Sequence, residues 1–277
     1  MKKHRKPVNY SRFSVYMISY IIAFIMLVPL IWMLVTSFKP EGAVVTVISE
    51  LLKPPFTLES YLKVNETSEI WRWTLNSVFV GIVQTAGTLL VSSLAAFAIS
   101  RIPFKGKNVI FLIILAGLMV PVEATIVPLF SMIADLGWVN SFKALILPGI
   151  ALPLGVLILK QFFDGIPTEL VEAAKMDGAS LFTIWYKIFL PLSRTSMAAL
   201  AIFVFVQSWN NFLWPLLVAT DSSMMTLPVG IPTFQSAFAT NLSVPMAANV
   251  IGSVPALIIF LIFQKHIIQG ITMTGIK

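Results

Sequence analysis

The sequence contains no cysteine and very little charge, and both absences restrict what the chain can be. Without cysteine there are no disulfides and no thiolate metal sites. Only 11% of the 277 residues are charged and 57% are hydrophobic, whereas a soluble domain carries about 25% charged residues. Several apolar runs approach the roughly 20 residues that cross a bilayer as a helix. The composition therefore predicts an all-α, polytopic membrane protein.

The sequence also lacks the groups of a catalytic or nucleotide-binding site. The two histidines, His4 and His266, lie near the ends of the chain, and neither has metal-ligand spacing to a second histidine or a cysteine. No Gly-x4-Gly-Lys-Ser/Thr loop is present to bind the phosphates of ATP. We therefore expect no enzyme activity, no catalytic residues and no metal or cofactor in this chain.

Hydropathy predicts six transmembrane helices in a single domain that covers residues 1–277. The predicted spans are residues 13–37, 74–100, 108–130, 144–163, 194–219 and 247–268. The basic N-terminus followed by an apolar run is similar to a signal peptide. However, the run is too long for the core of a signal peptide and no small-x-small cleavage site follows it, so we expect an uncleaved first span.

The distribution of basic residues predicts that both termini are cytoplasmic. With the N-terminus inside, 14 of the 19 Lys and Arg residues lie on the inner side, and 8 of the 12 acidic residues lie outside. The net charge of +7 then reflects basic cytoplasmic loops, and we expect no nucleic-acid partner. Four tryptophans fall near the outer ends of the spans, as in an aromatic belt: Trp71, Trp73, Trp138 and Trp214.

The inner loop of residues 164–193, here called the coupling loop, is charged and rich in small residues. Pro167 fits the first position of a short helix, and Gly178 fits the left-handed conformation that ends one. A second short helix is expected over residues 180–188, and Leu190-Pro191 is expected to turn the chain into the next span. The first helix has one narrow apolar face, made by Leu170, Ala173 and Ala174.

Two surfaces suit such a helix. A narrow face with small side chains fits a groove on another protein. The alternative is an interfacial helix on lipid, but those helices usually carry Lys, Arg and large aromatic residues rather than Glu-Ala-Ala.

The pattern Glu-Ala-Ala-x-x-Asp-Gly-Ala-x8-Ile-x-Leu-Pro resembles the cytoplasmic loop signature of ABC importer permease subunits. Every fixed position matches: Glu172, Ala173, Ala174, Asp177, Gly178, Ala179, Ile188, Leu190 and Pro191. In that family the loop forms the coupling helix, which docks in a cleft of the ATPase subunit. The resemblance implies the same role for these nine residues and a type I importer fold.

Other segments resemble the carbohydrate-uptake branch of that family, in particular the shorter, maltose-type permease. These segments are Ser37-Phe38-Lys39-Pro40, Asn76-Ser77, residues 92–98, 121–129 and 136–140, and the tail of residues 264–275. One departure is Trp209-Asn210-Asn211, where many relatives carry Trp-Asn-Glu. By resemblance, the tail of residues 270–277 reaches between the ATPase subunits.

The resemblance implies a set of partners and a location. The partners are a homologous permease subunit, two ATPase subunits that bind ATP and Mg²⁺, an extracytoplasmic solute-binding protein and a sugar. The loop of residues 220–246 is expected to face the binding protein and to help displace the sugar from it. The location is the cytoplasmic membrane of a bacterium or archaeon, with the chain surrounded by the lipid bilayer.

Two groups of polar residues are candidates for the substrate path. Gln84, Thr88 and Ser92 form a stripe on the second span, which suits either a path wall or helix–helix packing. Gln207, Trp209, Asn210 and Asn211 lie in the outer half of the fifth span, where amides and an aromatic ring suit a carbohydrate.

Three alternatives remain open from the sequence. An ABC importer could carry a polyol or a glycerol-phosphate-type substrate instead of an oligosaccharide. An ion-driven secondary transporter would require intramembrane acids or broken helices with repeat symmetry. An intramembrane enzyme would require a nucleophile or a metal set, and none is visible.

Overall fold

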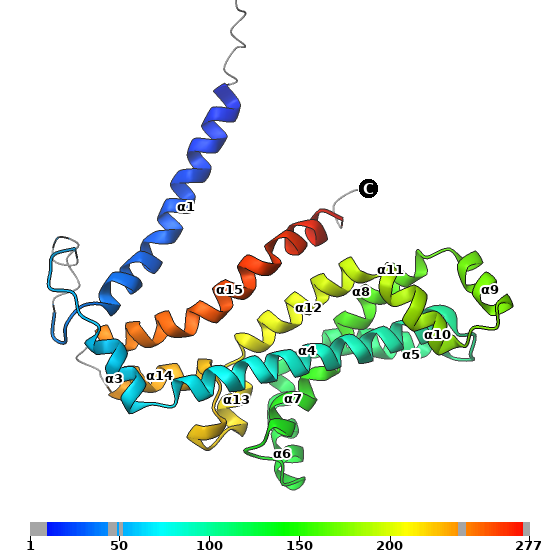
Figure 1. Cartoon of the computed structure of the whole chain (residues 1–277). Coiled ribbons are helices and arrows are strands. Elements are labelled where there is room, and N and C mark those ends of the chain that lie inside the picture. Colours follow the sequence, from blue (N-terminus) through cyan, green and yellow to red (C-terminus); the bar gives the residue numbers. More distant parts are fainter. Residues whose placement is uncertain (1–9, 44–48, 50–51, 238–241, 274–277) are drawn as a thin grey trace, which may run out of the picture. The chain divides into compact units, whose positions relative to one another are not determined.

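The computed structural model describes residues 10–43, 49, 52–237 and 242–273, and this part of the chain is helical without any strand (Figure 1). Its residues form two compact units. The first comprises Met1–Ser68 and Ile231–Ser253, and the second comprises Glu69–Gly230 and Val254–Lys277. The prediction of a single domain over the whole chain stays a prediction.

Among the described residues of the first unit, the helices α1 (Tyr10–Ser37) and α3 (Glu59–Thr67) lie wholly within it. None of the apolar window of α1 is buried within the chain. Such a surface suits lipid or another membrane helix. Parts of α14 (Leu227–Ala237) and α15 (Ser243–Met273) also belong to this unit.

The Ser-Phe-Lys-Pro segment after α1 is a structural anchor. Ser37 Oγ shares a hydrogen bond of 2.6 Å with the hydroxyl of Tyr61 in α3. The Lys39 side chain is buried, donates to the backbone carbonyl of Lys53 and lies 4.4 Å from the centroid of the Phe56 ring. These contacts satisfy a buried ammonium and hold the following loop against the end of α1.

The second unit is organised around α4 (Ile70–Arg101), which packs along three neighbours (Figure 1). These neighbours are α7 (Phe142–Ile150), α8 (Pro153–Asp164) and α12 (Arg194–Trp209). Its remaining helical elements are α5 (Lys107–Ala116), η1 (Gly117–Met119), α6 (Val122–Asp135), α9 (Thr168–Met176), α10 (Leu181–Ile184), η2 (Trp185–Phe189), α11 (Leu190–Leu192), α13 (Leu213–Val218) and η3 (Ser222–Met224).

The largest apolar core of this unit lies at the C-terminal end of α4. It joins buried side chains of α4, α8, α9, α10, η2 and α12. Phe189 is at its centre, with ring centroids 4.9 Å from Phe97 and 5.0 Å from Phe163, both in edge-to-face geometry. We call this set the α4-end core, and the coupling loop is built on it.

The N-terminal end of α4 holds the segment around η3 by hydrogen bonds. Trp73 Nε1 donates to the Ser222 carbonyl at 2.8 Å, and Asn76 Nδ2 donates to the carbonyls of Ser223 and Met225 at 2.9 Å. Ser77 Oγ accepts the amide of Leu227 at 2.8 Å. The Asn-Ser pair therefore fixes a turn of the chain.

Two side chains in this region, Trp73 and Asp221, have surroundings that bear on its chemistry. Trp73 is only 4% exposed, so its assignment to an aromatic belt at the lipid interface is wrong. Asp221 accepts the Ser223 amide at 2.8 Å. Hydrogen bonds from the Ser223 side chain and backbone hold the pKa of Asp221 below its ordinary value.

Two of the predicted spans are bent, and a further bend precedes the fifth predicted span. Within the described residues, two helices, Ser14–Ser37 and Ile70–Arg101, are long and apolar enough to cross a membrane, and the number rises to five if each of three bent pairs is one span. The pairs bend by 102° between Lys107–Met119 and Val122–Asp135, by 42° before Pro153 and by 80° before Arg194. The count of six spans stays a prediction, with α15 covering the sixth predicted span.

The third, fourth and fifth predicted helices are interrupted, the fourth between the end of α7 at Ile150 and the start of α8 at Pro153. The third breaks before Pro121, where Val120 is extended (φ −82°, ψ 117°) because a residue that precedes proline avoids the helical region. The fifth, predicted over 194–219, ends at Trp209, and α13 begins at Leu213. Pro215 has no N–H to continue the earlier helix.

Candidate functional site

The first helix of the coupling loop, α9, begins one residue later than the sequence predicts. Pro167 has φ −55° and ψ 136°, so it precedes the helix rather than occupying its first turn. Glu169 lies in the first turn, where the helix dipole favours a carboxylate. The helix ends at Met176 as expected.

The end of α9 explains the spacing of the Ala-Ala-x-x-Asp-Gly-Ala pattern. Gly178 has φ +77°, its amide donates to the Lys175 carbonyl at 3.0 Å, and the amide of Ala179 donates to the Ala174 carbonyl at 2.9 Å. This pair of bonds defines a Schellman motif with glycine at the left-handed position. Ala174 and Ala179 both pack on the α4-end core, as the apolar contact of that motif requires.

The outward face of α9 differs from the apolar face predicted from the sequence. Val171 is 5% exposed and Ala174 is half-buried against the chain's own core. Glu169, Glu172, Ala173 and Met176 are exposed, and their spacing places them on one side of the helix. Met176 is 88% exposed. This exposed surface consists of two carboxylates, a methyl group and a thioether, and is here called the outward face of α9.

The second helix of the loop runs to Leu192 and includes a π-helical segment, η2. It begins at Ser180, whose side chain accepts the amide of Thr183 at 3.1 Å. Ile188 and Leu190 pack on the α4-end core, while Pro191 is exposed. The chain turns at Ser193, so Leu190-Pro191 is the last turn of this helix and not the bend predicted from the sequence.

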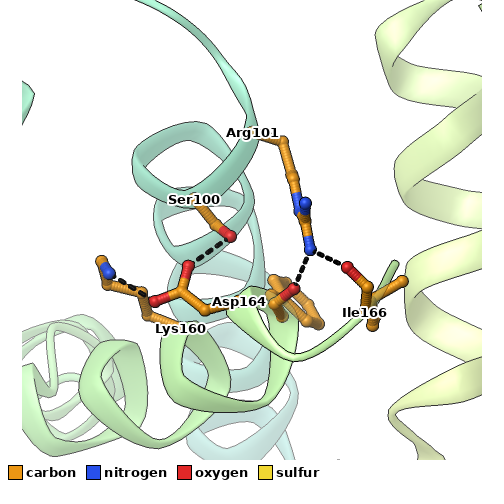
Figure 2. Close-up of polar contacts among 6 residues, drawn as sticks. Ser100, Arg101, Lys160, Asp164 and Ile166 are labelled. Carbon is orange, nitrogen blue, oxygen red and sulfur yellow. Dashed lines mark hydrogen bonds and ion pairs between the residues drawn. The ribbon is translucent and has the colours of Figure 1, made fainter. Parts of the chain in front are cut away.

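Several charged and polar side chains join α4 to the start of the loop (Figure 2). The carboxylate of Asp164 accepts from Ser100 Oγ at 2.7 Å and from Lys160 Nζ at 2.6 Å. Arg101 donates to the backbone carbonyls of Phe163 and Ile166. The role of Arg101 leaves no signal in the sequence, because its acceptors are backbone carbonyls.

Gln84 and Thr88, the candidate path residues of α4, make contacts between helices. Gln84 Nε2 donates to the Gly149 carbonyl at 3.4 Å, and its Oε1 accepts from Ser208 Oγ at 3.1 Å. Thr88 Oγ1 donates to the same carbonyl at 3.3 Å and is fully buried. These contacts join α4, α7 and α12, which favours the packing interpretation of the stripe.

Replacing Gln84 with methionine therefore tests its role. Methionine keeps the length of the side chain and removes both hydrogen bonds, each worth about 0.5–1.5 kcal/mol. We expect a lower temperature of heat inactivation in detergent with unchanged substrate preference. Ile82→Leu, at an exposed position of the same helix, is the control. An altered substrate preference without loss of stability would contradict the packing role.

The candidate path residues near the end of α12 differ in how far their side chains are exposed. Gln207 and Asn210 are exposed, whereas Trp209 is 7% exposed and stacks on Phe205 at 5.8 Å. Asn211 Oδ1 accepts the amide of Trp214 at 3.4 Å, at the start of α13. The buried ring of Trp209 has little surface to offer a sugar, so the amides of Gln207 and Asn210 remain the better candidates.

Comparison with known proteins assigns the chain to a family. Residues 88–273 match the family described as the binding-protein-dependent transport system inner membrane component. The chain belongs to this family. Its members are components of a membrane, which agrees with the apolar helices described above.

Curated relatives are similar over nearly the whole chain. An arabinooligosaccharides transport system permease protein of Halalkalibacterium halodurans is 39% identical, with 92% of this chain and 93% of the relative covered. A trehalose/maltose transport system permease protein of Thermococcus litoralis is 38% identical, with coverage of 93% and 94%. An sn-glycerol-3-phosphate transport system permease protein of Yersinia pestis is 35% identical, with coverage of 75% and 74%. These relatives are transport permeases and not enzymes.

A solved structure shares the fold. The bacterial ABC transporter involved in the import of the acidic polysaccharide alginate contains a chain that matches with a TM-score of 0.78 and 21% identity, covering 94% of this chain and 99% of that one. At this identity the match establishes the fold of an ABC transporter permease.

Two expectations from the sequence, the absence of a metal site and the role of the C-terminal tail, stay predictions. Within residues 10–43, 49, 52–237 and 242–273, no group of three or more His, Cys, Asp or Glu side chains is arranged to hold a metal ion. In the C-terminal tail, α15 continues through Met273, and residues 274–277 lie outside the described residues.

Proposed function

We propose that this chain is the shorter permease subunit of an ATP-driven importer of carbohydrates, with oligosaccharides as the substrate class. It works with a homologous permease subunit, two ATPase subunits that carry ATP and Mg²⁺, and an extracytoplasmic solute-binding protein. The permease holds six spans with both termini in the cytoplasm. It carries no cofactor of its own.

The outward face of α9 is the observation that supports ATPase coupling. The helix is stopped by Gly178, held on the α4-end core by Val171 and Ala174, and leaves Glu172, Ala173 and Met176 free for a partner. A helix presented in this way fits a groove on another protein. Cationic groups and an apolar hollow in that groove would complement the carboxylates and the thioether.

Closure of the ATPases on ATP would move α9 together with the core beneath it. Residues 166–190 form a compact loop on that core, so they are suited to move as one piece rather than to flex. The motion shifts the permease between inward-open and outward-open states. Nucleotide biases that equilibrium because the two states differ in their contacts with the ATPases.

The charge pattern of the spans supports a neutral sugar over a glycerol phosphate. The sequence has no Lys or Arg over residues 73–100 or 195–264, whereas recognition of a phosphate favours Arg or Lys. The exposed amides Gln207 and Asn210 suit hydroxyl groups. The two relatives with the greater identity transport arabinooligosaccharides and trehalose or maltose.

Transport by the complete complex in proteoliposomes tests the substrate class. With its binding protein and ATP supplied on the cytoplasmic side, we expect uptake of a labelled oligosaccharide and none of labelled glycerol 3-phosphate. Dissipating ion gradients with an ionophore should leave uptake intact. Uptake that follows an ion gradient without ATP, or that prefers glycerol 3-phosphate, would overturn the proposal.

A crosslink at position 173 tests the coupling role. The chain has no native cysteine, so Ala173→Cys places a single thiol on the outward face of α9. We expect a disulfide to a cysteine in the ATPase cleft, with a yield that changes when ATP binds. Leu75→Cys, at an exposed position on α4, is the control and should form no such bond. No crosslink at 173 under any nucleotide condition would refute ATPase docking.

A further inference from the structure

Arg101, the last residue of α4, contacts three separate segments around the coupling loop. Its guanidinium donates to the carbonyl of Phe163 at the end of α8 and to that of Ile166 in the link to α9 (Figure 2). It also lies 5.3 Å from the centroid of the Phe189 ring, in the helix that follows α9. One side chain therefore joins α4 to both sides of the loop.

The contacts of Arg101 are to backbone rather than to a carboxylate. The nearby Asp164 pairs with Lys160, and within the described part of the chain Arg101 forms no ion pair of its own. The carbonyls at a helix C-terminus lack partners inside the helix, and the rigid, forked guanidinium suits two acceptors at once. Because the acceptors are backbone carbonyls, these hydrogen bonds depend on the backbone conformation of the α8–α9 link and not on its side chains.

The opposite end of α4 is also tied down. The helix has 32 residues, which makes it about 48 Å long at 1.5 Å per residue. Arg72 donates to the Ser223 carbonyl at 3.0 Å, next to the bonds made by Trp73 and Asn76. The helix thus connects the coupling loop to the η3 segment by polar contacts at both ends.

Both hydrogen bonds of Arg101 are donated by one nitrogen, Nη2. The buried Nε has no hydrogen-bond partner within the described residues, which is costly for a donor. The guanidinium therefore keeps donors for other acceptors when the loop is repacked.

We propose that Arg101 is a positioning residue that makes α4 follow the α8–α9 link, so that movement of α9 reaches the η3 segment at the far end of α4. This rests on the proposed function of α9 as the ATPase contact. Without the guanidinium, α9 would still dock and move, but α4 would not move with it.

The test compares Arg101→Met with Lys105→Met in the assembled complex. Methionine keeps the apolar stem and removes the donors, while the control removes an exposed cation close by in the sequence and leaves the contacts between α4 and the loop intact. We expect binding-protein-stimulated ATP hydrolysis per assembled complex to fall about tenfold in Arg101→Met and to stay near the native rate in Lys105→Met. Arg101→Lys should recover part of the loss, because an ammonium still donates to carbonyls.

A distance measurement separates transmission from simple stability. Spin labels on Thr168→Cys and Ser222→Cys report α9 and the η3 segment. With Arg101 present, we expect the distance distribution between the labels to keep its width when ATP is added, and to broaden on ATP addition in Arg101→Met.

The outcomes separate the two proposals. A nucleotide-sensitive crosslink at position 173 together with native stimulation in Arg101→Met would overturn the role of Arg101 alone. A smaller amount of assembled complex, with native ATP hydrolysis per complex, would show that Arg101 has a purely structural role. That result would also overturn the proposed role of Arg101. Absence of the crosslink when Arg101 is intact would instead refute the proposed function.

Discussion

Replacing Gly178 with valine is expected to abolish sugar uptake while the protein remains in the membrane. Gly178 has φ +77°, and an L residue in this region is strained by about 1–2 kcal/mol, with a β-branched residue disfavoured further. The strain falls on the Schellman motif that ends α9 and orients Glu172 and Ala173. The helices of the bundle do not depend on this turn, so insertion should be unaffected.

Asparagine at the same position is the matched control. No atom lies within 4 Å of the place where a Cβ would be added to Gly178, so backbone conformation and not space decides the effect. Asparagine tolerates the left-handed region, and Gly178→Asn should keep most of the uptake. Uptake in vesicles, normalised to the amount of protein, is the measurement. Equal loss in both variants, or full uptake in Gly178→Val, would contradict this account of the turn.

The local parts of the coupling loop could be predicted from the sequence. A glycine at the end of a short helix, with alanines at the two positions that touch in a Schellman motif, is a pattern set by the nearest residues. The structure accordingly ends α9 at Met176 and places Gly178 at a positive φ. Where the contacts are between neighbours in sequence, residue types alone were sufficient.

The orientation of α9 could not be predicted in the same way. The sequence gives Leu170, Ala173 and Ala174 as one apolar face, yet Val171 and Ala174 are the residues that pack inward. This choice depends on the α4-end core, whose members come from helices far apart in the sequence. Hydrophobic spacing identifies a face only when apolar residues fall on one side, and α9 has them on two.

The positions of proline in the sequence do not predict which spans are broken. Pro29, Pro128 and Pro255 lie inside helices, whereas Pro121 and Pro153 stand at bends. A membrane helix tolerates proline when neighbouring groups satisfy the freed carbonyl. That condition is set by tertiary packing, so the prediction of the third, fourth and fifth spans as continuous helices is wrong.

With α9 as the proposed ATPase contact, replacing Ala173 with tryptophan is expected to separate the permease from the ATPase. Ala173 is exposed on the outward face of α9, so an indole does not disturb the chain's own core. In a groove fitted to a methyl group, overpacking costs about 1–3 kcal/mol, which is about five- to 150-fold in affinity. Co-purification of the ATPase and ATP-driven uptake should both fall, while the amount of permease in the membrane stays the same.

Two further variants identify the cause of that loss. Ala173→Ser keeps the size of the side chain and should retain the ATPase. Ala174→Trp places the indole against the α4-end core, because Ala174 packs there, so it should lower the amount of folded permease as well. If Ala173→Trp instead retains the ATPase and full uptake, the outward face of α9 is not the docking surface. If Ala174→Trp then loses the ATPase without losing permease, the docking surface is the face of Leu170, Ala173 and Ala174 predicted from the sequence, and α9 is turned differently in the assembled transporter.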